Sequence, residues 1–239
     1  NMINNSLVEK TIYLSLWVQF ITTALSLDGL NYDLAIEDAI LKDILILEAF
    51  VQFVEAFFYI WVIYSLKDLR KMTSRRYIDW FLTTPTMLIS TIIFMEYLRK
   101  KEKNEDTLNF WKFLKDHKEN IIKIVTYNFF MLVFGLLGEL NIIDKKIGVS
   151  IGFIFFGLSF KLIYDEYAKY TEGGKKLFLF LVSVWSLYGV SAMMPIVQKN
   201  AAYNILDIVA KNFYGLFIYY YIRNIGTRKG YLLEFTKTI

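Results

Sequence analysis

Residues 202–225 read AYNILDIVAKNFYGLFIYYYIRNI, a stretch that is almost entirely apolar and aromatic around Asp207 and Lys211. It is long enough to cross a bilayer as one helix, which takes about 20 residues. A lysine at that depth is costly, and ionisable groups inside membrane helices usually have a function. Because Asp207 stands four residues before Lys211, the two share one helical face. The segment therefore predicts a membrane helix whose lysine holds a cofactor covalently, with the aspartate offsetting its charge.

The rest of the chain has the composition of a membrane protein. Of its 239 residues 56% are hydrophobic and 21% are charged, which is too apolar for an ordinary soluble domain, and the charges cluster between apolar runs. Seven apolar segments can be marked, at residues 11–27, 40–66, 76–98, 120–143, 147–168, 176–199 and 201–225. No segment alternates with the period of a barrel strand, so helices are the expected spanning form. We predict one all-α domain, residues 1–239, that forms a seven-helix bundle as an integral multi-pass membrane protein.

The linkers predict how the bundle is oriented. The longest one, from Arg99 to Asn120, is strongly charged, and its Trp111 and Leu114 suggest a short interfacial helix. If the N-terminus is outside, this linker lies inside, and the inside segments hold 16 basic residues against eight in the outside segments, as the positive-inside rule favours. Residues 11–27 are followed by no evident cleavage site, so we expect a retained first helix rather than a signal peptide.

Several function classes are disfavoured by the composition. The chain has no cysteine, which excludes disulfides and thiolate metal sites, and its single histidine, His117, is expected to be a solvated loop residue rather than a metal ligand. The net charge of +4 suits basic loops that set topology and does not imply nucleic-acid binding. No set of nucleophile, base and orienting group appears, so we predict that the protein is not an enzyme. Membrane lipids are the expected surroundings.

The third apolar segment carries the partners for the lysine. It begins RYIDWFLTTP at residues 76–85. Arg76, Asp79 and Thr83 share one helical face, and Ser90 lies about 16 Å farther along nearly the same face. Buried charges must be paired, so Arg76 and Asp79 are expected to form one ionic cluster with Asp207 and Lys211 of the last segment. A purely structural cluster that joins two helices would explain the charges, but not why aromatic residues gather around them.

These motifs resemble those of the microbial (type 1) rhodopsins, bacteriorhodopsin and its relatives. The resemblance rests on RYxDWxxTTP in the third segment together with DxxxK in the seventh, and it extends over nearly the whole chain. Trp185 and Tyr188 match the family's WxxY, where Gly189 replaces a frequent proline. Met131 and Gly135 match positions beside the ring of retinal.

The resemblance implies a role for each of these residues. Lys211 would bind all-trans-retinal as a covalent Schiff base, with Asp79 as primary counterion and proton acceptor and Asp207 as second counterion. Arg76 would lie on the outer side and gate proton release. The pocket for the retinal chain would be lined by Trp80, Thr84, Met87, Met131, Gly135, Trp185 and Tyr188.

The chain departs from the proton-pumping relatives at one position. Where they usually have a carboxylate that returns a proton to the lysine nitrogen, this chain has Ser90, which completes a D-T-S motif with Asp79 and Thr83. The second segment supplies a possible substitute, because Glu48, Gln52, Glu55 and Tyr59 form a polar stripe, and Ser15 and Gln19 repeat the theme in the first segment. Such residues either join helices by hydrogen bonds or mark an ion path.

A second resemblance leaves the mode of transport open. Ser15, Glu55 and Asn212 resemble the central gate of channelrhodopsins, and viral rhodopsins of giant algal viruses share this combination and the short loops. We therefore expect a light-driven outward proton transporter of the viral rhodopsin type, with a light-gated cation channel as the alternative and a sensory photoreceptor third. Protons or monovalent cations would be carried, and relatives predict a homo-oligomer, a trimer or a pentamer.

Overall fold

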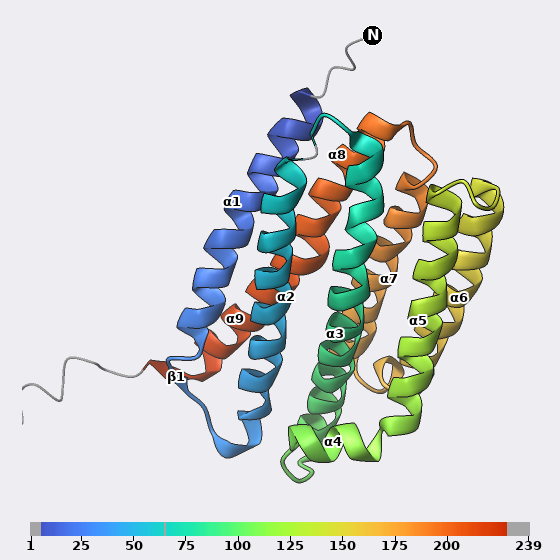
Figure 1. Ribbon diagram of the computed structural model, residues 1–239. Helices are drawn as coiled ribbons and strands as arrows, with labels where there is room; N and C mark the ends of the chain where they lie inside the picture. Colours follow the sequence, from blue (N-terminus) through green and yellow to red (C-terminus); the bar gives the residue numbers. More distant parts are fainter. Residues whose placement is uncertain (1–5, 65, 229–239) are drawn as a thin grey trace, which may run out of the picture.

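The computed structural model describes residues 6–64 and 66–228, whose helices form a bundle of seven spans arranged side by side (Figure 1). Six spans are single helices: α1 Ser6–Gly29, α2 Ile40–Ile63, α3 Leu69–Lys103, α5 Lys118–Glu139, α6 Lys145–Glu166 and α7 Glu172–Ser191. The seventh consists of α8 Ile196–Asp207, a π-helical turn Ile208–Asn212, and α9 Phe213–Ile225. The predicted seven-helix fold is confirmed, whereas residues 1–5, 65 and 229–239 of the predicted domain lie outside the described residues.

The spans differ in how apolar they are. Four described helices, α2, α3, α5 and α6, are long and apolar enough to cross a membrane by length and composition alone. Helix α1 carries polar side chains along its buried face, at Ser15, Gln19, Thr22 and Ser26. The seventh span is divided by its π-helical turn. A test of length and composition alone therefore finds fewer spans than the bundle contains, because some spans carry polar residues that face the interior.

The segment predicted at 176–199 is wrong at its end. Helix α7 stops at Ser191, and Pro195 is the residue before the first turn of α8, so residues 196–199 belong to the seventh span. Proline has no N–H to donate and disfavours a helix interior, but its fixed φ suits a helix start. Because the apolar run continues across this proline, hydropathy does not show the boundary between the sixth and seventh spans.

Short elements complete the ends of the bundle. The linker after α3 contains α4, Phe110–Asp116, which confirms the predicted short helix, and the Asn109 side chain caps it by accepting from the Lys112 amide at 3.0 Å. Strands β1, Tyr32–Asp33, and β2, Thr227–Arg228, form an antiparallel pair that an all-α reading does not anticipate. Single 3₁₀ turns occur at Ile36–Asp38 and Ala168–Tyr170. We refer to the end of the bundle that carries α4 as the α4 end, and to the opposite one as the N-terminal end.

His117 is not the solvated loop residue that was expected. It joins α4 to α5, stacks on the Phe113 ring with 4.2 Å between ring centroids, and places Nδ1 2.9 Å from the Tyr167 hydroxyl. Its partial burial lowers the pKa of the imidazole below the ordinary value of 6.5. The histidine therefore packs α4 against the end of α6.

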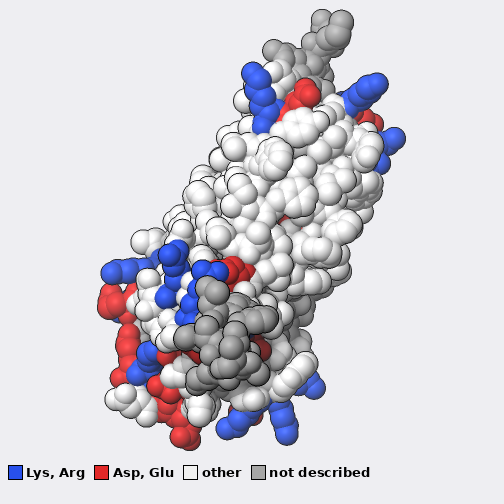
Figure 2. Space-filling view, turned by 90° about the vertical axis from the view of Figure 1, so that its left-hand side faces the viewer, with Lys and Arg blue, Asp and Glu red and all other residues white. Residues whose placement is uncertain are grey.

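The surface and the interior are reversed relative to a soluble protein. On the face shown in Figure 2, lysine, arginine and acidic residues gather at the two ends, and the band between them is almost free of charge. Large apolar side chains such as Trp17, Phe53 and Ile154 are exposed in the helices. The interior instead holds buried ionic groups, among them Arg76 and Glu48. This arrangement suits a chain whose apolar surface faces lipid while its functional groups lie inside.

Candidate functional site

The ammonium of Lys211 lies among three carboxylates from three spans. Its Nζ is 2.8 Å from Asp79 Oδ2 of α3, 3.3 Å from Glu55 Oε1 of α2, and 3.6 Å from Asp207 Oδ1 on its own span. All four side chains are buried, and Lys211 is only 2% exposed. The predicted ionic cluster thus forms, and Glu55, which was expected in an ion path, joins it directly.

Lys211 belongs to the π-helical turn at 208–212. Such a turn inserts one extra residue into the α-helical register and is frequent at functional sites. Here the consecutive side chains of Ala210, Lys211 and Asn212 are all buried. The turn therefore directs more of this span into the interior than a regular helix would.

The carboxylates differ in how many hydrogen bonds they already accept. Asp207 accepts from the Tyr59 hydroxyl at 2.5 Å and from the Tyr188 hydroxyl at 2.6 Å, and Arg76 Nη1 lies 3.4 Å from its Oδ2. Asp79 Oδ1, in contrast, has no hydrogen-bond partner among the described residues. Asp79 therefore has an oxygen available to receive a proton, whereas both oxygens of Asp207 are already engaged.

Arg76 connects the cluster to the N-terminal end of the seventh span. Its Nε donates to Asn200 Oδ1 at 3.2 Å, and its Nη2 donates to the Asn204 side chain and to the Asn200 carbonyl oxygen. Its ion pair is with Asp207, although Asp79 shares its helical face. Arg76 is thus a bridge between α3 and α8 rather than a partner of Asp79, the acidic residue nearest to it in the sequence.

Asn200 and Asn204 were not identified from the sequence. A signal for them exists, because Asn200, Asn204, Asp207 and Lys211 follow one another at spacings of four, three and four residues, which predicts one helical face. Asn204 also donates to Thr11 Oγ1 of α1 at 2.8 Å. The polar stripe of the seventh span is therefore longer than the DxxxK motif.

Thr83 and Thr84 bond to the backbone rather than to carboxylates. The Thr83 hydroxyl donates to the Asp79 carbonyl oxygen at 2.9 Å, and the Thr84 hydroxyl donates to the Trp80 carbonyl oxygen at 2.6 Å. Asn128 of α5 donates to Thr84 at 2.8 Å. Both threonines thus bond back to α3 just before Pro85, and Thr84 also ties α3 to α5.

An apolar pocket adjoins the ionic cluster. Its empty volume, open mouth included, is about 650 Å³. It is lined by Tyr77, Trp80, Met131, Leu132, Gly135, Val149, Gly152, Phe153, Phe156, Trp185, Tyr188, Gly189, Ala192 and Tyr203. Five residues expected around a cofactor are among these, whereas Thr84 and Met87 are buried elsewhere.

Glycine is needed at two places in the pocket wall. A Cβ on Gly135 would come within 2.8 Å of the Tyr77 hydroxyl oxygen, and a Cβ on Gly189 within 2.4 Å of the Phe153 ring. Real Cβ atoms do not approach other atoms this closely, so a larger residue would force these two rings of the pocket wall to shift. Gly189, which replaces the frequent proline of the resembled family, thus helps to shape the pocket.

A second polar group lies between the Lys211 cluster and the α4 end. The Ser90 hydroxyl of α3 donates to Glu48 Oε1 of α2, and both side chains are fully buried. One turn along α2, Gln52 accepts from the Ser26 hydroxyl at 3.2 Å. Its amide packs so closely against the seventh span that a Cβ on Gly215 would lie 2.0 Å from Nε2. Ser90 and Glu48 are therefore brought together across two helices, which sequence spacing did not predict.

Asn212 lies in a network with α1. Its amide donates to Gln19 Oε1 at 3.0 Å and to Thr22 Oγ1 at 2.7 Å, and Gln19 donates to Ser15 at 3.3 Å. The predicted path residues thus fall into separate groups: Ser15 and Asn212 in this network, Gln52 and Glu48 nearer the α4 end, and Glu55 at Lys211.

A buried ion pair near the N-terminal end was not identified from the sequence. Lys199 Nζ of α8 lies 2.8 Å from both carboxylate oxygens of Glu139, the last residue of α5, and Lys145 Nζ of α6 lies 3.6 Å from Glu139 Oε2. The pair joins α5, α6 and α8. The sequence prediction placed Lys199 at the end of the sixth apolar segment, because the start of the seventh span was set too late.

Comparison with known proteins agrees with this geometry. The family model of bacteriorhodopsin-like proteins matches residues 10–225. No curated protein sequence matches the chain. Among solved structures, the viral rhodopsin OLPVRII is similar with a TM-score of 0.78 and 28% identity, covering 92% of this chain and 100% of that one.

Two further structures are similar at lower identity. A blue light-absorbing proteorhodopsin from Med12 has a TM-score of 0.70 and 17% identity, covering 91% of this chain and 97% of that one. Xanthorhodopsin, described as a light-driven ion pump with dual chromophore, has a TM-score of 0.69 and 17% identity, covering 92% and 93%. These two show the fold alone, but the family model spans nearly all of the chain. The chain belongs to the bacteriorhodopsin-like family of microbial rhodopsins.

Proposed function

We propose that this protein is a light-driven outward proton transporter that carries all-trans-retinal on Lys211. The observation that carries the proposal is the 2.8 Å contact between Lys211 Nζ and Asp79 Oδ2 inside a buried ionic cluster. A proton on the lysine nitrogen is thereby already in hydrogen-bond contact with a carboxylate that can accept it. Family membership implies a retinal chromophore on a lysine, and Lys211 is the lysine whose position fits.

The pocket fits a flat apolar cofactor attached to Lys211. Its walls include the rings of Trp80, Trp185 and Tyr188. Tyr188 also donates to Asp207, which lies 3.6 Å from the lysine nitrogen, so the pocket wall reaches the ionic cluster. Concave pockets lined by apolar and aromatic side chains with few polar groups are typical of small-molecule sites.

When bound, retinal would supply absorption of light and a change of shape that reorients the lysine nitrogen. The residues around the nitrogen then determine where its proton goes. Asp79 has a free oxygen and receives the proton. Asp207 is held by Tyr59, Tyr188 and Arg76, and it stays negatively charged, which balances the positive charge of Arg76. This division of roles follows from the hydrogen bonds that each carboxylate already accepts.

The path from Asp79 to the outer side would pass Arg76. With the N-terminus outside, the N-terminal end of the bundle is the outer end, and Arg76 and its asparagine partners lie between the cluster and that end. A shift of the guanidinium between Asp207 and Asn200 would alter the charge next to Asp79. That is how a buried arginine gates proton release in this proposal.

A light-gated cation channel is the second candidate. The observation in its favour is the polar seam along α1, where Ser15, Gln19 and Thr22 face Asn212 of the seventh span. If these hydrogen bonds opened, water could enter and form a path beside Glu55. Polar residues within membrane helices often line such ion paths. The residues are all buried, so in this conformation the seam is closed. A homo-oligomer, trimer or pentamer, remains a prediction from relatives, and a sensory role has no specific observation behind it.

Photocurrent measured against membrane voltage in retinal-supplied cells tests the proposal. A pump predicts an outward current at every voltage, whereas a reversal potential that follows the Na⁺ or K⁺ gradient would establish the channel instead. Lys211→Ala is the control, and it should abolish both the current and the visible absorption band of retinal-treated protein. A retinal-linked visible band that survives this substitution would show that the attachment site lies elsewhere.

A further inference from the structure

We propose that Glu48 is the internal proton donor of this protein, in place of the carboxylate that Ser90 lacks. It would hold a proton on the α4 side of Lys211, deliver it to the lysine nitrogen after Asp79 has taken the first one, and then take a new proton from the α4 end. The inference rests on the proposed proton transport.

The geometry places Glu48 where such a donor must be. Ser90 lies about 16 Å from Asp79 along α3, on the α4 side of the cluster, and its hydroxyl donates to Glu48 Oε1. Glu48 and Glu55 share one face of α2, separated by about 10 Å along the helix axis. The carboxyl group thus occupies the space beside Ser90 although it comes from a different helix.

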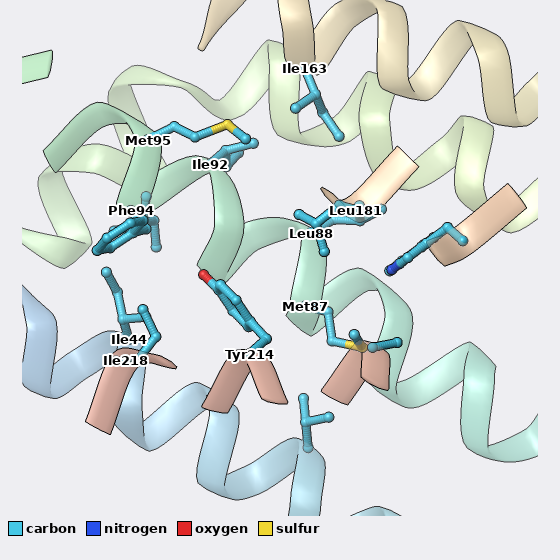
Figure 3. Packing of buried hydrophobic residues seen from close by; sticks show 14 of the residues in the cluster. Ile44, Met87, Leu88, Ile92, Phe94, Met95, Ile163, Leu181, Tyr214 and Ile218 are labelled. Atoms are coloured by element: carbon cyan, nitrogen blue, oxygen red, sulfur yellow. The ribbon is translucent and has the colours of Figure 1, made fainter. Parts of the chain in front are cut away.

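The surroundings of Glu48 favour a protonated carboxyl group. Within the described part of the chain no ion pair includes Glu48, and the Ser90 hydroxyl is its hydrogen-bond partner. Buried apolar side chains occupy the neighbouring turns of α2, α3 and α9, namely Ile44, Leu45, Leu88, Ile92 and Ile218. Figure 3 shows Tyr214 within this layer, among Ile44, Leu88 and Ile218. An unpaired carboxylate is strongly disfavoured in an apolar layer, so the group keeps its proton.

A route from Glu48 to the lysine nitrogen can be followed through polar groups. Glu48 Oε2 has no hydrogen-bond partner among the described residues, and the same holds for Gln52 Nε2 and the Tyr214 hydroxyl. Gln52 lies between Glu48 and Glu55 on α2, and Tyr214 comes three residues after Lys211. Water held by these two groups would bridge a gap of about 10 Å.

Reloading would occur from the α4 end. Tyr97 lies seven residues beyond Ser90 on α3, and its hydroxyl donates to Asp38 at 2.5 Å. Lys101 donates to the same carboxylate at 2.6 Å, in a polar pocket that opens at this end. In each cycle one proton leaves Glu48 for the Lys211 nitrogen and one enters from the α4 side, so the carboxyl group returns to its starting state.

The test compares Glu48→Gln with the wild type in retinal-loaded vesicles. A pH-sensitive dye should show that proton uptake after a flash slows at least tenfold, while the earlier proton release keeps its rate. Sodium azide, a small proton carrier, should restore uptake in the variant. Adding Ser90→Asp to Glu48→Gln should restore it as well, because a carboxyl group then returns to the same space. Glu172→Gln, which changes an exposed glutamate, is the matched control and should leave uptake unchanged.

A second readout needs neither light nor transport. Infrared spectra of the retinal-free protein in the dark should contain the deuterium-sensitive C=O band of a protonated carboxyl group that disappears in Glu48→Gln. Ser90→Ala, which leaves the carboxyl in place, should shift this band and serves if Glu48→Gln does not fold. An unchanged uptake rate in Glu48→Gln, or no change of the band in either variant, overturns the inference and leaves the proposed transport standing. Absence of light-driven proton release from the wild type refutes the proposed function itself, and with it the donor role.

Discussion

Lys211 is one ammonium among three carboxylates, and their hydrogen bonds make the three unequal. Asp207 is held by two tyrosine hydroxyls and a guanidinium, whereas Asp79 has a free oxygen and the shortest contact to the lysine. Glu55 contacts Lys211 at 3.3 Å, and neither of its carboxylate oxygens has a hydrogen-bond partner in the part of the chain that the structure describes. A site with this asymmetry can pass a proton to one carboxylate while another remains charged.

Asp79→Asn tests this division of roles. Removing the carboxylate nearest the lysine nitrogen takes away the negative charge that stabilises a cation there, so the visible absorption of the retinal-loaded protein should shift to the red. Proton release after a flash should fall to the dark level, because the free acceptor oxygen is gone. Absorption spectra and dye-detected pH changes measure both effects. Asp79→Glu keeps a carboxylate and should retain part of the release, and an unchanged spectrum in Asp79→Asn would mean that another group is the main counterion.

For single residues, the sequence predicts which side chains lie on the same face of one helix, but not which side chains of other helices they contact. The spacing of Asp207 and Lys211 predicted their proximity correctly, and both residues are buried in one cluster. The partners of Arg76 and of Ser90 lie on other helices, at Asn200 and Glu48, and no spacing within one helix identifies them. Contacts between helices depend on how each helix is rotated and shifted along its axis, which hydropathy leaves undetermined.

Among the helices, the seventh span shows what a local reading misses. Pro195 marks its start, yet the apolar run from α7 continues past it, so the start was predicted five residues too late. The π-helical turn at 208–212 is a change in hydrogen-bond register, and composition carries no sign of it. Both features affect the site, since the first brings Lys199 and Asn200 into the span and the second positions Lys211.

The contribution of the buried Lys199–Glu139 pair to the free energy of unfolding can be measured. Lys199→Met leaves Glu139 largely buried, with Lys145 at 3.6 Å as its remaining cation. The free energy of unfolding should therefore fall, but by less than the roughly 3–5 kcal/mol that a fully uncompensated buried charge costs. Lys199→Met with Glu139→Leu should recover most of the loss, because no buried charge remains. Lys161→Met removes an exposed pair with Asp165 and should cost under about 1 kcal/mol. Denaturant titration of purified protein compares them, and equal losses in all three would contradict the argument.

The molecule as a whole combines an apolar exterior with a polar interior, and its two ends are not alike. The α4 end carries the charged linker between α3 and α5, and the N-terminal end carries Arg76 and its partners. Outward transport requires the release path through Arg76 to open outside and Glu48 to reload from inside. The direction of transport therefore depends on the predicted orientation, N-terminus outside, which comes from the positive-inside rule.

Because the chain contains no cysteine, single cysteines can report this orientation directly. Lys146→Cys lies at the start of α6 near the N-terminal end, and Lys112→Cys lies on α4 at the opposite end, and both positions are exposed. A membrane-impermeant maleimide added to intact cells should label Lys146→Cys at once, and should label Lys112→Cys only after the membrane is permeabilised. The wild type, without cysteine, is the blank. Labelling in the reverse order would place Arg76 on the inner side, and the same proton path would then run inward.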